Sequence, residues 1–243
     1  MGLDRLLGHA QFEGDRLVGP AAGDERQHLA LARALAAREW RLVIDARGAP
    51  ALEAARRELA ALTDVTALVG DVGDERHRRA LVTAAGDRID ALVNNASILG
   101  PSPQPALDAY PLDVLEDVLK VNALAPLRLI QLALPAMPDG ARIVNVTSDA
   151  AVEAYEGWGG YGASKAALEQ ITQVLAAERP HLAVYAFDPG DMNTALHQEA
   201  FPGEDISDRP PPEDSVPALL ALLAGDLRVQ QRTAAVDRAD RLH

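Results

Sequence analysis

Short apolar runs alternate with longer segments of helical periodicity along most of the chain. The apolar runs lie at 40–46, 65–71, 89–97, 141–148, 182–190 and 232–236. Between them, helical patterns occupy 29–39, 50–62, 74–85, 111–137, 161–178 and 213–225, and the stretch 17–32 begins like a strand and continues like a helix. Continuously apolar strands that are each followed by a helix indicate a parallel sheet covered on both faces.

Right-handed crossovers between such strands produce a doubly wound fold. The pattern therefore predicts an α/β protein with one domain over 1–243, a doubly wound parallel sheet (Rossmann-like) flanked by helices. Residues 1–16 form an atypical N-terminal extension in this interpretation. Residues 195–213, rich in Pro and acidic side chains, form a substrate-lid loop. A solvated surface loop explains the same composition equally well.

Polar residues follow the ends of several predicted strands, where ligands bind in doubly wound sheets. These residues are Asp71, Asn94, Asn95, Ser97, Thr147, Ser148, Pro189 and Gly190. Their accumulation at one edge of the sheet predicts a ligand site there.

The formal net charge of −13 over 243 residues opposes nucleic acids and anionic membranes as partners. The chain has no cysteine, which excludes disulfides, a thiolate metal site and a cysteine nucleophile. The first residues lack a signal-peptide pattern, and no run approaches the length of a membrane span. We therefore expect a soluble cytoplasmic protein without a metal, a nucleic-acid partner or a membrane.

The stretch YGASK carries the clearest candidate chemistry. Tyr161 and Lys165 are four residues apart and share one face of a helix. A free phenol has a pKa of about 10. An ammonium about 4 Å away favours the phenolate by about 4 kcal/mol at an effective dielectric of about 20. Such a phenol could exchange a proton with a carbonyl or alcohol oxygen.

Lys165 is one of only two lysines, with Lys120, among 23 basic residues. A Tyr-x-x-x-Lys pair alone is weak evidence, because most such pairs are surface neighbours. Two further residues strengthen it. Ser148 ends the preceding strand and could hold the same substrate oxygen. Asn122 lies inside a long helical segment, where an amide is a modest helix former, and it suits a role in holding a helix distortion or a water.

The segments NNAS, VNALAP, IVNVTS, YGASK and DPGDMNT occur in the order and spacing of one known family. Over roughly 29–237 the chain resembles a short-chain dehydrogenase/reductase. The resemblance implies a catalytic tetrad of Asn122, Ser148, Tyr161 and Lys165. Tyr161 is then the general acid/base and Ser148 polarises the carbonyl. Lys165 lowers the Tyr161 pKa and binds the nicotinamide ribose, and Asn122 holds a water.

The resemblance also implies a set of cofactor contacts. Pro189 and Gly190 border the nicotinamide, and Thr194 meets its carboxamide. Asn94 and Ala96 line the cofactor, and Asp71 approaches the adenine. The family carries glycine where this chain has Ser97.

The end of the second strand bears on the choice of cofactor. The position that usually holds an NAD-selecting acid has Ala46, and Asp45 comes one position early. Arg47 follows and could meet a 2′-phosphate. The resemblance thus favours NADP(H) over NAD(H), although Arg47 could equally be a surface residue.

The family's glycine-rich phosphate loop is Thr-Gly-x-x-x-Gly-x-Gly. With three extra residues allowed, its glycine positions fall on Gly19, Gly23 and Glu25, so two of three fit. Asp24 could cap the following helix instead, and the same GDER tetrapeptide precedes another helix at 73–76. A carboxylate about 5 Å from a phosphate costs about 3 kcal/mol at the same dielectric. The loop is therefore expected to be impaired, with Arg26 offsetting part of the loss.

The leading hypothesis is an NADP(H)-dependent oxidoreductase that interconverts a carbonyl and an alcohol on a small or medium organic substrate. Two alternatives remain: a cofactor-free acid/base enzyme such as an isomerase or dehydratase, and a non-catalytic binding subunit. The resemblance implies a homodimer or homotetramer formed through two long helices. A partly apolar substrate pocket is expected to include Ile98, Leu99, Val152, Trp158 and Met192.

Overall fold

The computed structural model describes residues 16–20, 25–225 and 232–234. The predicted N-terminal extension, apart from Arg16, lies outside the described residues, as do Gly23 and Asp24.

Within the described residues the sheet has seven strands, all parallel, in the order β3-β2-β1-β4-β5-β6-β7. The strands are β1 (Arg16–Pro20), β2 (Arg41–Ala46), β3 (Val65–Val69), β4 (Ala91–Asn94), β5 (Arg142–Val146), β6 (Ala183–Asp188) and β7 (Arg232–Ala234). From β1 the chain adds β2 and β3 on one side, and it then adds β4 to β7 on the other side of β1, so the strand order reverses between β1 and β4. This is the switch point where doubly wound folds bind ligands at the carboxyl ends of the strands. The predicted fold class is confirmed.

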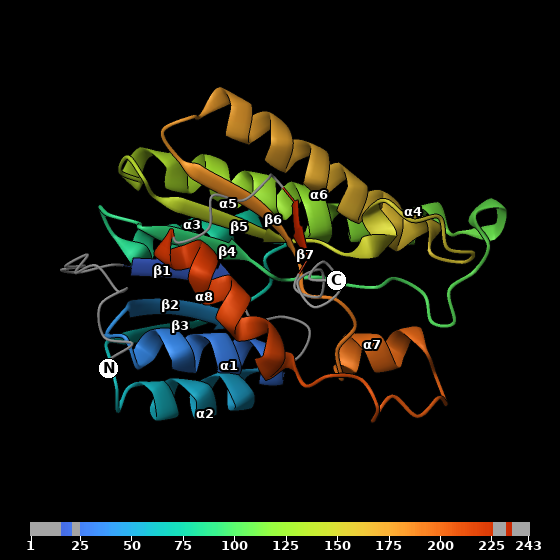
Figure 1. Ribbon diagram of the computed structural model, residues 1–243, viewed down its shortest axis with the longest axis horizontal. Helices are drawn as coiled ribbons and strands as arrows, with labels where there is room; N and C mark the ends of the chain where they lie inside the picture. The colour runs from blue at the N-terminus through green and yellow to red at the C-terminus, as the bar shows by residue number, and fades with distance from the viewer. Residues whose placement is uncertain (1–15, 21–24, 226–231, 235–243) are drawn as a thin grey trace, which may run out of the picture.

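Helices cover both faces of the sheet (Figure 1). One layer contains α1 (Glu25–Ala36), α2 (Ala49–Leu59) and α8 (Val216–Ala224). The other contains α3 (Glu75–Ala85), α4 (Leu112–Leu119), α5 (Ala125–Ala133) and α6 (Gly159–Glu178). Two apolar clusters, one on each face, form the core: Leu35, Ile44 and Leu222 belong to the first, and Leu81, Leu92 and Leu129 to the second.

The segment expected as one helix at 111–137 is interrupted in the structure. A π-helical turn, Lys120–Leu124, separates α4 from α5, and a short 3-10 turn, Leu134–Ala136, follows. In the described part of the chain, Leu112–Ala136 is the one helical run long and apolar enough to cross a membrane, and half of its most apolar window is buried inside the fold. Buried core helices meet the same criterion, so the run is weak evidence for a membrane span.

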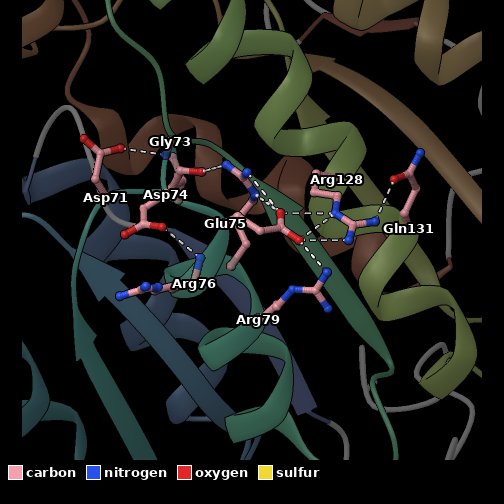
Figure 2. A network of polar contacts seen from close by, with 10 residues as sticks. Asp71, Gly73, Asp74, Glu75, Arg76, Arg79, Arg128 and Gln131 are labelled. Atoms are coloured by element: carbon pink, nitrogen blue, oxygen red, sulfur yellow. Dashed lines mark hydrogen bonds and ion pairs between the residues drawn. The ribbon is translucent and has the colours of Figure 1, made fainter.

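The second GDER tetrapeptide begins α3. Asp74 caps this helix by accepting a hydrogen bond of 2.8 Å from Arg76 N. Glu75 forms ion pairs with Arg79 and with Arg128 of α5, both at 2.8 Å (Figure 2). The tetrapeptide is therefore a helix start stabilised by protein contacts, as the sequence predicted.

The segment 195–213 is more regular than its composition suggests. Its first residues form α7 (Ala195–Ala200), and Pro212–Ser215 form a 3-10 turn. Thr194 caps α7 by accepting a hydrogen bond of 3.1 Å from His197 N. The segment expected as a loop thus contains a short helix, because a good N-cap begins a helix too short to show periodicity. Figure 1 shows α7 outside both helical layers.

Candidate active site

Helix α6 carries Tyr161 and Lys165 against the ends of β5 and β6. Both side chains are buried, with 6% and 2% exposure. The helix comes close to the turn after β5, since a Cβ added at Gly162 would lie 2.6 Å from the carbonyl oxygen of Ala150. Glycine at this position lets the helix bring the pair to the sheet edge.

The Lys165 ammonium is held by the end of β5. Its Nζ donates a hydrogen bond of 2.9 Å to Val146 O and lies 5.5 Å from the centroid of the Tyr161 ring. Burial lowers the pKa of Lys165 to about 8, and the nearby Asp188 opposes this shift. An ammonium has three N–H donors, so two remain for a bound ligand.

The phenol of Tyr161 behaves differently from the sequence expectation. Burial raises its pKa above the ordinary value, while Ser97 lowers it, Asp188 raises it further and Ser148 lowers it. A lowering of this pKa by Lys165 is therefore not found. The buried phenol has lost its solvation, and the ammonium donates to Val146 O. Tyr161 is therefore protonated at neutral pH and suited to donate a proton.

Ser148 follows β5 and is already engaged in two hydrogen bonds. Its Oγ donates to Asp149 Oδ1 at 2.9 Å and accepts from Ala150 N at 3.2 Å. The other carboxylate oxygen of Asp149 accepts a hydrogen bond of 2.9 Å from the Tyr155 hydroxyl. The sequence reading did not identify Asp149, although a carboxylate directly after Ser148 was the available signal.

Asn122 lies in the π-helical turn and is fully buried. Its Nδ2 donates to Ile98 O and to Ser164 Oγ, and its Oδ1 accepts from Ile98 N, all at 2.9 Å. The expected helix distortion is present at this residue. The amide joins the distorted helix to the segment after β4 and to α6.

The turn after β6 forms the opposite wall of the site. Asp188 Oδ1 accepts a hydrogen bond of 3.0 Å from Gly190 N, and Gly190 adopts a φ of 74° that favours glycine. Pro189, Gly190 and Thr194 line the same pocket as Ser148, Tyr161 and Lys165. The structure thus brings these six predicted residues together.

The other predicted residues lie around this pocket. Asn94 Nδ2 donates to Asn145 Oδ1 at 2.8 Å, while its own Oδ1 is buried and has no hydrogen-bond partner within the described residues. Ala96 is buried among apolar side chains of the second core cluster. Gly19 lies in β1, next to the switch point. Asp71 follows β3, and its Oδ1 accepts a hydrogen bond of 2.7 Å from Gly73 N.

Asp45 and Arg47, at the end of β2, lie in different environments. Asp45 is buried, and its Oδ2 lies 2.8 Å from Nε2 of His77 on α3. Arg47 is exposed at the carboxyl edge of the sheet. Asp45 is therefore engaged by α3, while Arg47 is exposed at the ligand edge.

The expected apolar wall is only partly correct. Leu99, Trp158 and Met192 line the pocket, but Ile98 and Val152 do not. Val152 is 58% exposed, because the 3-10 turn after Ser148 directs it outward. His197 and Leu196 of α7 line the pocket instead, and the sequence reading missed them because it did not recognise that helix.

Two unsatisfied polar groups test whether a nicotinamide cofactor fits this edge. Among the described residues, Lys165 Nζ bonds only to Val146 O, and Asn94 Oδ1 is a buried acceptor without a partner beside the switch point. Hydroxyl-bearing ligands such as ribose can pair with both kinds of group. The residues on this side of the site fit the cofactor, while Gly23 lies outside the described residues.

Comparisons with known proteins agree with this geometry. A sequence model of the short chain dehydrogenase family matches residues 29–205. The uncharacterized oxidoreductase YciK of Escherichia coli K12 is 36% identical over 144 residues, which cover 58% of this chain and 56% of YciK. Sepiapterin reductase of Bos taurus is 33% identical over 174 residues, 65% of each chain. The chain thus spans less than two thirds of these curated relatives.

A solved structure from Escherichia coli CFT073, described as a short chain dehydrogenase complexed with NADPH, superposes with a TM-score of 0.78. The two chains are 26% identical, and the match covers 92% of this chain and 97% of the other. The family match covers most of the chain and includes all four residues of the predicted tetrad. The chain therefore belongs to the short-chain dehydrogenase/reductase family.

Proposed function

We propose that this protein is an NADP(H)-dependent oxidoreductase that interconverts a carbonyl and an alcohol on a small or medium organic substrate. One observation carries the proposal: a buried phenol, Tyr161, and a buried ammonium, Lys165, face one pocket together with the hydroxyl of Ser148. Burial of an ammonium and a phenol is unfavourable for folding alone, and perturbed groups of this kind gather at functional sites.

The chain's own residues have distinct tasks in this proposal. In the reducing direction Tyr161 donates its proton to the carbonyl oxygen while a C–H bond forms at the carbonyl carbon. Lys165 holds ribose hydroxyls with its two remaining donors and stabilises the phenolate left by Tyr161. Asn122 positions the segment after β4 through its two bonds to Ile98. A bound nicotinamide supplies or accepts the hydride.

Leu99, Trp158 and Met192 give the pocket an apolar wall. Such a wall suits an organic carbonyl with an uncharged body. Leu196 and His197 of α7 line the same pocket, which supports the proposal that 195–213 acts as a substrate lid.

Preference for NADP(H) is supported by the end of β2. Asp45 is buried and its Oδ2 pairs with His77, so it is poorly placed to accept hydrogen bonds from an adenosine ribose. Arg47 is exposed there and can pair with a 2′-phosphate. The NADPH complex of the Escherichia coli CFT073 structure adds support from a related fold.

The test is a fluorescence titration of the purified protein with NADPH and, separately, with NADH. We expect micromolar binding of NADPH, weaker binding of NADH, and a loss of this preference in Arg47→Ala. The matched control is Arg179→Ala, an exposed arginine that follows α6 at the other end of the sheet. Equal NADPH affinity in Arg47→Ala and the control would contradict the assigned preference.

The acidic GDER sequence at 23–26 favours the alternative of impaired cofactor binding. Absence of binding of both nicotinamides at millimolar concentration would contradict the oxidoreductase proposal. Turnover without added nicotinamide would then indicate a cofactor-free isomerase or dehydratase. Neither binding nor turnover would indicate a non-catalytic binding subunit.

A further inference from the structure

Ser97 replaces the glycine that the family carries after its Asn-Asn-Ala sequence, and its hydroxyl has no assigned role. We propose that Ser97 Oγ donates a hydrogen bond to the reacting oxygen of the substrate, beside Tyr161, and thereby takes over a task expected of Ser148. This proposal rests on the proposed carbonyl–alcohol function.

The first observation is the state of the Ser97 side chain. Ser97 is 7% exposed, and its Oγ is buried without a hydrogen-bond partner in the described part of the chain. It lines the pocket that also contains Tyr161, Ser148 and Lys165. Buried hydroxyls in native proteins are nearly always paired, so an unpaired one that faces a pocket points to a ligand atom.

The second observation concerns Ser148. A serine hydroxyl has a single proton, and Ser148 donates it to Asp149 at 2.9 Å. Asp149 is held in this position because its second oxygen accepts from Tyr155 and its first also accepts from Ala150 N at 2.8 Å. A carboxylate is a stronger acceptor than a neutral carbonyl oxygen, so Ser148 is a poor donor to the substrate.

The two observations complement each other. The hydroxyl of Ser148, which the family uses, is bonded to Asp149. Ser97 supplies a second hydroxyl at a position where the family's glycine has no side chain. Ser97 and Ser148 both lie near enough to Tyr161 to lower the pKa of its phenol against the effect of burial. A donor that stabilises the phenolate oxygen is close enough to the reaction centre to reach the oxygen that exchanges its proton with Tyr161.

The experiment compares Ser97→Ala, Ser148→Ala and the exposed control Thr83→Ala on α3, with NADPH and 2,3-butanedione as probes. We expect Ser97→Ala to lower kcat/KM by roughly 100-fold, as loss of one donor to a developing oxyanion does. Ser148→Ala should have a smaller effect and Thr83→Ala none. NADPH affinity should stay unchanged in all three. A Ser97→Ala enzyme within twofold of the wild type would overturn the proposal.

A double-mutant cycle with Asp149→Ala tests the competition for the Ser148 proton. Removal of the carboxylate frees Ser148 to donate to the substrate. The Ser97→Ala penalty should then fall from roughly 100-fold to below about fivefold. An unchanged penalty in the Asp149→Ala background would refute the exchange of roles.

A readout without substrate separates this proposal from the proposed function. Ser97→Ala removes an unpaired buried hydroxyl, so the melting temperature of the cofactor-free protein should stay equal or rise. A lower melting temperature would show that the hydroxyl has a structural partner and would overturn the proposal, whether or not NADPH binds. Failure of NADPH to bind the wild type would instead count against the proposed function.

Discussion

Substitution of Lys165 by methionine should make the ligand-free protein more stable at neutral pH and remove its activity. Methionine fills much of the space of the lysine stem without the charge. Burial holds the pKa of Lys165 at about 8 instead of its ordinary 10.5. This difference corresponds to about 3 kcal/mol by which the charged side chain destabilises the fold at pH 7.

The sign follows from proton binding. Between pH 8 and 10.5 the unfolded chain keeps a proton on this lysine and the folded chain does not. Stability therefore rises with pH in this window, and about 2 kcal/mol of the difference should be recovered between pH 7 and 9.5. The lost hydrogen bond to Val146 O offsets about 1.5 kcal/mol of this gain, so the variant stays more stable than the wild type at pH 7.

The assay is urea unfolding of wild type and Lys165→Met, followed by circular dichroism from pH 7 to 9.5. The wild-type free energy of unfolding should approach or overtake that of the variant as pH rises, with the gap changing by about 2 kcal/mol. Curves that stay parallel within about 0.5 kcal/mol would refute the assignment of a strongly perturbed lysine.

Two predictions concern the scaffold around the site. Gly162→Ala should lower the free energy of unfolding by about 1–3 kcal/mol, because the alanine Cβ would lie 2.6 Å from Ala150 O. This clash outweighs the higher helix propensity of alanine. A variant that is more stable than the wild type in urea unfolding would contradict the prediction. Glu75→Gln should lower the free energy of unfolding at neutral pH. Because Arg128 holds the pKa of Glu75 at about 2, the difference in this free energy between wild type and variant should decrease as pH falls from 4.5 toward 2. A gap that is constant between pH 6 and 3, on thermal melting, would exclude the ion-pair network as its cause.

The sequence was sufficient for the fold because each strand and its following helix have their own local pattern. The four-residue spacing of Tyr161 and Lys165 also needed no tertiary knowledge, since a helix fixes it. The π-helical turn was anticipated only through Asn122, an amide in an apolar helix. Its partners, the main-chain groups of Ile98, are distant in the sequence and could not be named from it.

The pKa values and hydrogen bonds of the site residues could not be predicted as well as the fold. The sequence indicated that Lys165 would lower the Tyr161 pKa, but burial of both groups has the larger effect in the ligand-free protein. The hydrogen bond from Ser148 to Asp149 depends on the rotamer of Asp149, which cannot be predicted from a sequence pattern. Helix α7 was missed because six residues are too few to show an apolar face.

The most direct test of the central assignment is carbonyl reduction by Tyr161→Phe, which removes only the phenolic oxygen. We expect NADPH to bind this variant with unchanged affinity, while kcat for 2,3-butanedione falls by at least about 100-fold, because the proton donor is lost. A variant that binds NADPH and keeps a kcat within a few-fold of wild type would show that another group protonates the substrate.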